Sequence, residues 1–481
     1  MKILLLIPLT DTVENVVRDV LYGCWCKGKR IGGAKVPPLV LLSVATVLKE
    51  DENEVRLLDA PAEDMSLNDV KKLVKKYDVL LLLTSTMTFN EDADVLAELK
   101  KSNKKLITVI FGSHPTFMPE YCLKKKGVDI IVRKEPEYVI RDLVRALREK
   151  LDWKETNGIG FKDKKIVINP DYPFIDIEDL PICDRSLLPK DVVYDNPIVK
   201  KYPYTTSETS RGCPGRCYFC TAPQMYGEKI RYWSAEKVIR EIEELKRLGY
   251  KEIYYRDETF TTFKERNIKI CNEIISRKLK ISWLCNVRIG TVDKETLALM
   301  KKAGCHTIKI GVESGVQEIL NKSNKGVRVE DTEKLFRWAR ECGMNTHAHL
   351  MLGMPGETKE TIKKTVEFVK KINPNTIDVG ICTPYPGTKL FSDVAKDHPE
   401  IKDGTSVGLG NLHTDGSFNV HFTNLTKEDL EKALSDFYRS FYMRPSHAIR
   451  NVLQIRSYSD FKRIYEASLN LLKFIVKKGK D

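Results

Sequence analysis

The chain has 481 residues, of which 42% are hydrophobic and 31% are charged, and its net charge is +13. This length allows two or three domains with separate cores, and no apolar run reaches the roughly 18 residues that a membrane span needs. The twelve cysteines lack the paired spacing of extracellular domains, and Asp11 and Glu14 follow the apolar start too soon for a signal peptide, so we expect a cytoplasmic protein.

Residues 1–150 alternate short apolar runs with amphipathic segments. Strands separated by single helices pair in parallel, so this pattern predicts a five-stranded, doubly wound, Rossmann-like sheet. A ligand of such a sheet binds beyond the carboxyl ends of the strands, where we expect the loops 8–10, 84–88 and 112–116. The predicted strands span residues 3–8, 55–60, 79–84, 106–112 and 130–132, and the predicted helices span 39–49, 67–77, 93–100, 116–126 and 137–150.

The loop before the first predicted helix holds Cys24 and Cys26 in a glycine-rich, aromatic setting. A CxC pair alone is weak support for a metal site, so we interpret this loop as the lining of a cofactor or substrate cleft, with metal ligation as the alternative. Residues 151–204 lose the regular period, and their repeated X-Pro pairs predict a connector that follows the surface.

Strand–helix alternation returns in residues 205–395. Six such units predict a partial parallel (β/α)6 barrel, whose chemistry gathers at the carboxyl ends of the strands. The predicted strands span residues 205–210, 252–256, 281–287, 307–312, 346–352 and 377–383, and the predicted helices span 235–248, 263–278, 294–302, 329–342 and 358–371.

Three cysteines, Cys213, Cys217 and Cys220, follow the first strand of this barrel with CxxxCxxC spacing. Thiolates at this spacing can enclose a soft metal site from one loop. The next cysteine, Cys271, is far along the chain, and three ligands on a 4Fe–4S cluster leave one iron open to an outside chelator. A zinc knuckle, or three cysteines that merely share a loop, is the alternative interpretation.

The run RGCPGRCYFC at 211–220 resembles the signature of the radical S-adenosylmethionine (SAM) family. The resemblance implies that the amino and carboxylate groups of SAM chelate the open iron, and that one electron from the cluster releases a 5′-deoxyadenosyl radical. It also implies an external electron donor such as flavodoxin or ferredoxin.

Polar residues end the second, third and fourth predicted barrel strands, where burial of a charge is costly unless a partner compensates. LMLGMPGET at 350–358 resembles a SAM-adenine motif of the same family, and TPYPGTKLF at 383–391 resembles its cobalamin-linked subfamily. The resemblance implies that SAM contacts the following residues: Asp257, Glu258, Asn286, Arg288, Glu313, Ser314, Gly353 and Pro355.

Four stretches of the first domain resemble the cobalamin-binding domain that many radical SAM enzymes carry: PPLVLLSVATVLKE, VRLLDA, FGSHPT and RKEPE. The DxHxxG motif of other cobalamin proteins is absent, and no histidine precedes His114, so the resemblance implies cobalamin bound without a protein imidazole. A Rossmann-like domain without cobalamin is the alternative. The implied cobalamin-binding residues are Thr84, Ser85, Gly112, Ser113 and His114.

Residues 396–481 form the predicted C-terminal region, with helices at 427–441 and 459–477 after a loop-rich stretch. FYMRPSHAIR at 441–450 resembles a C-terminal element of cobalamin-type radical SAM proteins. No cysteine follows Cys382, which excludes the cysteine-rich auxiliary-cluster domain of some radical SAM families.

The resulting prediction is a class B radical SAM enzyme with three cofactors, a 4Fe–4S cluster, SAM and cobalamin, that methylates an unactivated carbon of a small-molecule, lipid or other substrate. A ring-forming or rearranging radical SAM enzyme acting on an isoprenoid lipid or tetrapyrrole, without methyl transfer, is the first alternative. A non-enzymatic iron–sulfur redox protein is the second. Basic residues are spread over helix faces, so we expect no nucleic-acid partner, and peripheral membrane contact is left open.

Overall fold

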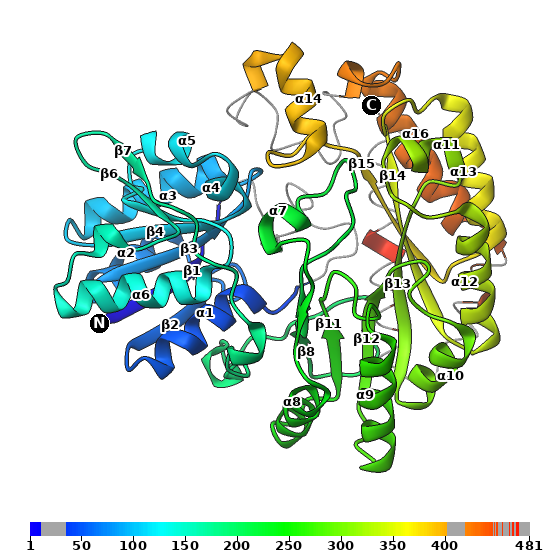
Figure 1. Ribbon diagram of the computed structural model, residues 1–481, viewed down its shortest axis with the longest axis horizontal. Coiled ribbons are helices and arrows are strands. Elements are labelled where there is room, and N and C mark those ends of the chain that lie inside the picture. The colour runs from blue at the N-terminus through cyan, green and yellow to red at the C-terminus, as the bar shows by residue number, and fades with distance from the viewer. Residues whose placement is uncertain are drawn as a thin grey trace.

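The computed structural model describes residues 1–10, 35–401 and 419–445, and beyond these residues 447, 449–450, 455, 461, 464–465 and 468–470. Two α/β units lie side by side in this part of the chain (Figure 1). The predicted loop with Cys24 and Cys26 lies outside the described residues, as does most of the predicted helix 459–477. Among the described helices, none is both long enough and apolar enough to cross a bilayer.

The first unit is a seven-stranded sheet in the order β2-β1-β3-β4-β5-β6-β7. Its first five strands pair in parallel, as predicted, because a helix returns the chain to the same end after each strand. Leu4 and Leu6 pack under α2, α3 and α5, whereas Ile3 and Leu5 point to the other face and pack under α1 and α6. The elements are β1 (Lys2–Ile7), β2 (Glu54–Asp59), β3 (Val79–Thr84), β4 (Ile107–Gly112), β5 (Ile130–Val132), α1 (Leu39–Glu50), α2 (Leu67–Leu73), α3 (Phe89–Ser102), α4 (Ser113–Phe117), α5 (Pro119–Lys124) and α6 (Pro136–Glu149).

Two features of this unit differ from the prediction. The hairpin of β6 (Ile159–Lys162) and β7 (Ile166–Ile168) adds two antiparallel strands to the sheet, within the segment predicted to be a connector. These strands have four and three residues, too few for a strand period to stand out. The helix predicted at 116–126 is two helices, because Pro119, which has no backbone N–H, starts a new helix after α4 has ended.

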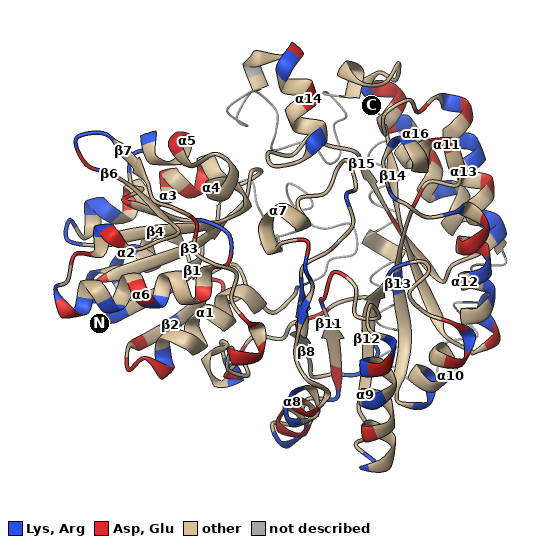
Figure 2. Cartoon of the chain, viewed as in Figure 1, with Lys and Arg blue, Asp and Glu red and all other residues tan. Residues whose placement is uncertain are grey.

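The second unit confirms the predicted partial barrel. Its six strands are all parallel, in the order β15-β14-β13-β12-β11-β8, and helices cover the outer face of the curved sheet (Figure 1). Charges of both signs alternate along α8, α9, α10 and α12 (Figure 2). The elements are β8 (Tyr204–Ser207), β11 (Glu252–Tyr255), β12 (Ser282–Val287), β13 (Cys305–Glu313), β14 (Asn345–Leu352), β15 (Thr376–Ile381), α8 (Ala235–Arg247), α9 (Lys264–Ser276), α10 (Lys294–Lys302), α12 (Val329–Glu341), α13 (Lys359–Ile372) and α16 (Lys427–Tyr442).

Several short elements accompany the two sheets and their main helices. The predicted first strand 205–210 is interrupted, because Thr209 turns out of the sheet to bind Asp257, and the chain continues as β9. The additional elements are β9 (Ser210–Arg211), β10 (Arg231–Tyr232), α7 (Ala222–Tyr226), α11 (Gln317–Lys322), α14 (Lys389–Asp397), and the short 3-10 helices η1 (Val74–Lys76), η2 (Trp153–Glu155), η3 (Ile177–Asp179), η4 (Arg185–Leu187), η5 (Pro399–Ile401) and η7 (Asn419–His421).

Buried ion pairs join the two units. The motif RKEPE, which opens α6, supplies Glu135 and Glu137. Glu137 lies 2.6 Å from the guanidinium of Arg211, and Glu135 lies 2.8 Å from that of Arg231. Ser43 of α1 donates a third bond to Glu137. The acidic turn of the first unit therefore binds arginines that flank the cysteine loop of the second.

Candidate functional site

The three predicted ligand cysteines lie on one loop at the barrel rim, and none of them forms a disulfide. Backbone bonds fix the loop at both ends: Cys213 N donates to Gly227 O, and Tyr218 N donates to Ser323 O. In the part of the chain that the structure describes, the three sulfur atoms do not form a group within 4.8 Å of one another. Three free thiols on one loop are a donor set that fits a multinuclear iron–sulfur cluster.

A basic side chain flanks this loop closely. A Cβ added at Gly215 would come 3.1 Å from Nη1 of Arg288 and 3.3 Å from Sγ of Cys213. The other end of the guanidinium donates to Lys325 O at 2.7 Å. Glycine at 215 thus allows Arg288 to lie directly against the cysteine loop.

The environment of Glu258 is that of a ligand-binding residue. Both of its carboxylate oxygens are buried, and neither has a hydrogen-bond partner among the described residues. Burial, together with the neighbouring carboxylate of Glu208, raises the pKa of Glu258 well above its usual value. A buried carboxylate left in this way is stabilised by a cationic ligand. This environment fits the amino group of SAM.

Glu313 and Lys325 form an ion pair at the same rim. The two side chains are 2.7 Å apart and nearly buried. Glu313 has a left-handed φ of 60°, at a bulge where the register between β13 and β14 shifts. Such bulges and strained residues concentrate near active sites. Lys325 was not predicted, because nothing in its own stretch of sequence indicates this partner.

Other predicted SAM residues are held by the protein itself. Asp257 accepts bonds from Thr209 N, Thr209 Oγ1 and Ser210 Oγ, and Asn286 donates to Asp257 O. These bonds tie β9, β11 and β12 together beneath the rim. Ser314 is likewise bonded internally, to Thr365 Oγ1 at 3.1 Å. A direct SAM contact from each of these side chains stays a prediction.

The predicted adenine motif forms a tight turn after β14. Gly353 has a φ of 72°, and a Cβ there would come 2.3 Å from Nδ2 of Asn419. Asn419 donates to Gly353 O, and Glu357 accepts from Gly353 N and Met354 N. Pro355 is half-buried at the turn. Hydrogen bonds within the protein therefore hold this turn in place.

The predicted cobalamin loops meet at the ends of β3 and β4. A Cβ at Gly112, whose φ is 123°, would lie 2.2 Å from Thr84 O, so only glycine permits this close approach. Thr84 turns inward to bind Asp92, and Ser85 is also buried. Ser113 is partly exposed. Gly112 thus lets the ends of β3 and β4 pack closely, and small side chains at 84, 85 and 113 fit the approach of a planar macrocycle.

His114 is fully buried within the first unit. Its Nδ1 lies 3.1 Å from Thr86 Oγ1, and its ring packs 4.8 Å from that of Phe89. A direct contact between this side chain and a cofactor is therefore not expected from the structure. The partly exposed neighbours Thr86 and Met87 are better placed, and sequence reasoning did not single them out.

The two predicted cofactor regions meet at the boundary between the units. The hydroxyl of Tyr385 donates to Met87 Sδ at 3.5 Å, and a Cβ at Gly387 would come 2.6 Å from the ring of Phe117. An apolar cluster that contains Cys382 includes Met118 of the first unit and Tyr218 of the cysteine loop. The motif TPYPGTKLF therefore bridges the loops of the first sheet and the barrel rim.

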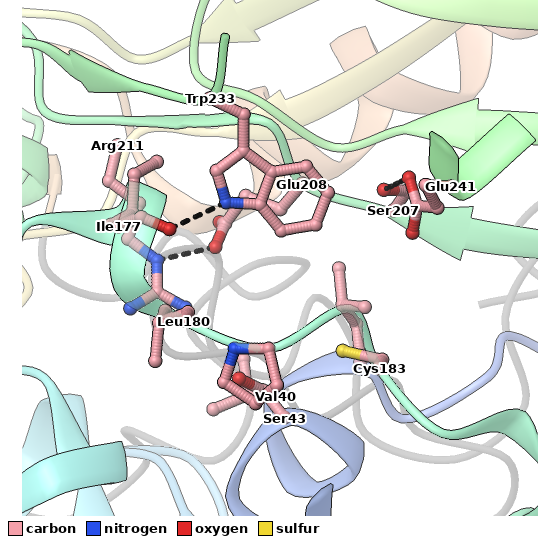
Figure 3. Close-up of a pocket in the computed structure, with 12 residues that line it drawn as sticks. Val40, Ser43, Ile177, Leu180, Cys183, Ser207, Glu208, Arg211, Trp233 and Glu241 are labelled. Atoms are coloured by element: carbon pink, nitrogen blue, oxygen red, sulfur yellow. Dashed lines mark hydrogen bonds and ion pairs between the residues drawn. The ribbon is translucent and has the colours of Figure 1, made fainter. Parts of the chain in front are cut away.

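A cavity also lies between α1 of the first unit, the segment 177–183 and the start of the barrel (Figure 3). The polar side chains that line this cavity bind one another. Arg211 forms an ion pair with Glu208, and Ser207 donates a hydrogen bond to Glu241 at 2.6 Å. Burial raises the pKa of Glu208 to about 7. Since its polar groups bind one another, we interpret this cavity as part of the domain junction rather than as a ligand site.

The inner wall of the barrel carries polar residues that sequence reasoning missed. His347 and His349 lie on β14, Asp378 lies on β15, and Lys309 of β13 binds the hydroxyl of Tyr254. Burial lowers the pKa of His349, and lowers that of His347 well below its usual value. The signal was present in the sequence as the alternation of His347 and His349 with apolar residues in the predicted strand, which is the pattern of a strand with a partly polar face.

Comparisons with known proteins agree with this geometry. A model of the radical SAM superfamily matches residues 207–369, and a model of the B12 binding domain matches residues 32–144. The uncharacterized methyltransferase PH0819 of Pyrococcus horikoshii is 32% identical over 461 residues, which cover 94% of this chain and 95% of that protein. An anaerobic magnesium-protoporphyrin IX monomethyl ester cyclase of Rubrivivax gelatinosus is 29% identical over 77% of this chain and 69% of that protein.

Among solved structures, the fold is similar to that of the radical S-adenosylmethionine methyltransferase TsrM from Kitasatospora setae. The TM-score is 0.64 at 19% sequence identity, and the match covers 83% of this chain and 77% of that one. At this identity the likeness concerns the fold alone.

Proposed function

Because this chain belongs to the radical SAM enzymes that carry a B12-binding domain, we propose that it methylates an unactivated carbon of its substrate. The family uses a 4Fe–4S cluster, SAM and cobalamin. When bound, the cluster supplies the electron that cleaves SAM, and cobalamin supplies the methyl carrier. One observation carries the proposal: the loops at the ends of β3 and β4 touch the barrel rim that holds the cysteine loop, through Tyr385 and Gly387.

Within this proposal, we assign the following roles to residues of this chain. Cys213, Cys217 and Cys220 hold the cluster, while the orphaned carboxylate of Glu258 receives the amino group of SAM. Arg288 lies against the cysteine loop, where its two-pronged guanidinium suits the carboxylate of SAM. The apolar cluster around Cys382 excludes water from the boundary between the units.

We further propose that the predicted domain division holds with one change. The first unit, predicted to end at residue 150, extends through β7, because the hairpin β6–β7 completes its sheet. The connector then runs to residue 204, and the barrel and C-terminal region keep the predicted bounds of 205–395 and 396–481. Flavodoxin or ferredoxin as reductant, and a small-molecule or lipid substrate, stay predictions.

The proposal is tested without knowledge of the substrate. The anaerobically reconstituted protein is incubated with hydroxocobalamin, SAM and a chemical reductant, and two products are counted, 5′-deoxyadenosine and S-adenosylhomocysteine. Because methylation consumes SAM both as radical source and as methyl donor, we expect both products. 5′-Deoxyadenosine alone would favour the ring-forming alternative, and neither product would favour the non-enzymatic one.

A matched pair of variants assigns the cluster. Alanine at all three of Cys213, Cys217 and Cys220 should abolish bound iron, the visible absorbance of the cluster and both products. Cys342→Ala, on the outer helix layer, should change none of these readouts. Retention of a full cluster in the triple variant would move the site to other cysteines.

A further inference from the structure

Three potential metal ligands lie together on the inner wall of the barrel. His347 and His349 alternate on β14 with Ala348 and Leu350, which pack into the core under the outer helices. On β15, Asp378 alternates in the same way with core residues. Because strand side chains point to opposite faces in turn, both imidazoles and the carboxylate face the concave side of the sheet.

The strand register brings these groups within reach of one ion. In the register of β14 and β15, His349 lies opposite Asp378. His347 lies opposite Thr376, two residues earlier on each strand. One ligand atom from each of the two histidines and from Asp378 all lie within 4.8 Å of one another. His349 Nδ1 is 3.6 Å from Asp378 Oδ2. Among the described residues, this is the one group of three that meets this distance.

Neighbouring hydroxyls orient two of the three ligands. His347 Nδ1 lies 2.7 Å from Thr376 Oγ1, which fixes the ring and leaves Nε2 as the nitrogen suited to a cation. Tyr438 of α16 donates to Asp378 Oδ1 at 3.3 Å. Hydrogen bonds of this kind, from a second layer of residues to the ligands, are a regular feature of protein metal sites.

Lys309 is the nearby positive charge, and burial together with this charge lowers the pKa of both histidines, although the ammonium group of Lys309 is bonded elsewhere. Lys309 pairs in register with His347, but its ammonium bonds the hydroxyl of Tyr254 and lies over that ring at 4.8 Å from the centroid. Tyr254 is on β11, which lies on the opposite side of β13 from the histidines. The lysine side chain therefore extends away from β14 and β15.

We propose that His347, His349 and Asp378 bind one divalent transition-metal ion, such as Zn²⁺ or Fe²⁺, inside the barrel. Two imidazoles and one carboxylate on one side of an ion leave its remaining positions open. Those positions face the barrel interior and would take water or an oxygen of the substrate. The site is separate from the cysteine loop, because it lies within the strands rather than at their carboxyl ends.

The test is zinc binding by the full-length reconstituted protein. After incubation with one equivalent of zinc chloride and desalting, elemental analysis should find about one zinc per chain in addition to the cluster iron. His347→Ala combined with His349→Ala should lose this zinc, whereas His398→Ala, outside the barrel wall, should keep it. Thr376→Val removes only the bond to His347 Nδ1, and we expect it to weaken zinc binding roughly 10- to 100-fold.

Two further measurements distinguish zinc bound at the histidines from zinc bound at the cysteine loop. The variant with all three loop cysteines changed to Ala should retain the zinc, so a failure of the proposed cluster does not affect this result. X-ray absorption at the zinc edge should find nitrogen and oxygen ligands without sulfur. Sulfur ligation, zinc that stays bound in the double histidine variant, or no zinc in the unaltered protein would each overturn the proposal.

Discussion

Glu258 illustrates how a single buried charge can identify a ligand site. A carboxylate that is buried without a hydrogen-bond partner destabilises the protein unless it is protonated or meets a cation. Asp257, its neighbour in sequence, is also buried, yet its oxygens accept three bonds from Thr209 and Ser210. Two adjacent carboxylates therefore have opposite roles, one structural and one open to a ligand.

This contrast gives the first prediction. Glu258→Gln should weaken SAM binding by about 1–3 kcal/mol, roughly 5- to 150-fold in Kd, because a charge-assisted hydrogen bond is lost. The melting temperature of the ligand-free variant should not fall, since the carboxyl group of Glu258 makes no side-chain hydrogen bond that the substitution could remove. Calorimetric titration and thermal melts measure the two quantities.

Asp257→Asn is the matched control for Glu258→Gln. Because all its accepted bonds come from the protein, this change should lower the melting temperature of the ligand-free protein. If Glu258→Gln lowers the melting temperature and leaves SAM affinity unchanged, Glu258 is a structural residue and the assignment fails.

At the scale of elements, the turn between β14 and α13 carries the second prediction. Glu357 accepts backbone bonds within this turn, and burial raises its pKa from the usual 4.5 to about 7. Because the pKa of Glu357 is higher in the folded protein than in the unfolded chain, its protonated form favours the folded state. This contribution to the free energy of unfolding is full below about pH 4.5 and is lost as pH rises through about 7. Its size is at most about 3 kcal/mol.

Glu357→Gln removes this titration. The melting temperature of the variant minus that of the unaltered protein should therefore rise between pH 5 and pH 8. Glu360→Gln, at an exposed position of α13, is the control, and its difference should not rise over this range. A pH-independent difference for Glu357→Gln would mean that its carboxyl group does not titrate in this window.

The sequence predicts the strands of both sheets well because buried parallel strands are continuous apolar runs. VLLLLT at 79–84 is an example, and β3 has these bounds. The hairpin β6–β7 escapes prediction, since its strands of four and three residues are too short to show a period and depend on the existing sheet edge for partners. Short helices such as α11 have too few residues for a period to be visible.

The same reasoning explains which site residues could be predicted. Local spacing in the sequence identifies the three cysteines, Cys213, Cys217 and Cys220. The position at the end of a predicted strand identifies Glu258 and Arg288. Lys325 reaches Glu313 only through tertiary packing of the loop after α11. Asp378 was missed for a similar reason, because its partners His347 and His349 come from a neighbouring strand.

At the scale of the whole molecule, the junction between the units rests on Arg211 and Glu137. Although burial opposes it, the guanidinium of Arg211 holds the pKa of Glu137 below its usual value. Both side chains are almost completely buried. Removal of Glu137 leaves the buried guanidinium with Glu208 as its remaining close partner, and loss of one partner of a buried ion pair is strongly destabilising.

We therefore expect Glu137→Ala to lower the free energy of unfolding by roughly 3–5 kcal/mol. Glu149→Ala in the same helix removes only a half-exposed partner of Arg148, and should change the stability by less than about 0.5 kcal/mol. Denaturant unfolding, followed by fluorescence, measures both. Equal effects of the two substitutions would contradict the role of Glu137 as the main contact between the units.

The last prediction concerns cobalamin coordination and uses the architecture of both units. His114 is the one histidine in residues 1–150, and its ring is enclosed by Phe89 and Tyr121 within the first unit. The next histidine in the chain, His306, is buried against Glu252 in the barrel. Neither imidazole is placed to reach a macrocycle bound at the ends of β3 and β4, so we expect neither of them to supply a nitrogen to cobalt.

Cobinamide makes this test specific for nitrogen from the protein. It lacks the benzimidazole of cobalamin, so any axial nitrogen on cobalt must then come from the protein. The full-length protein is loaded with hydroxocobalamin or cobinamide, the cobalt is counted, and the Co(II) forms are examined by electron paramagnetic resonance. We expect stoichiometric cobalt with hydroxocobalamin, and no nitrogen superhyperfine splitting from bound cobinamide. Clear splitting with cobinamide would contradict the predicted coordination, whereas no bound cobalt would remove the methyl carrier and favour radical chemistry without methylation.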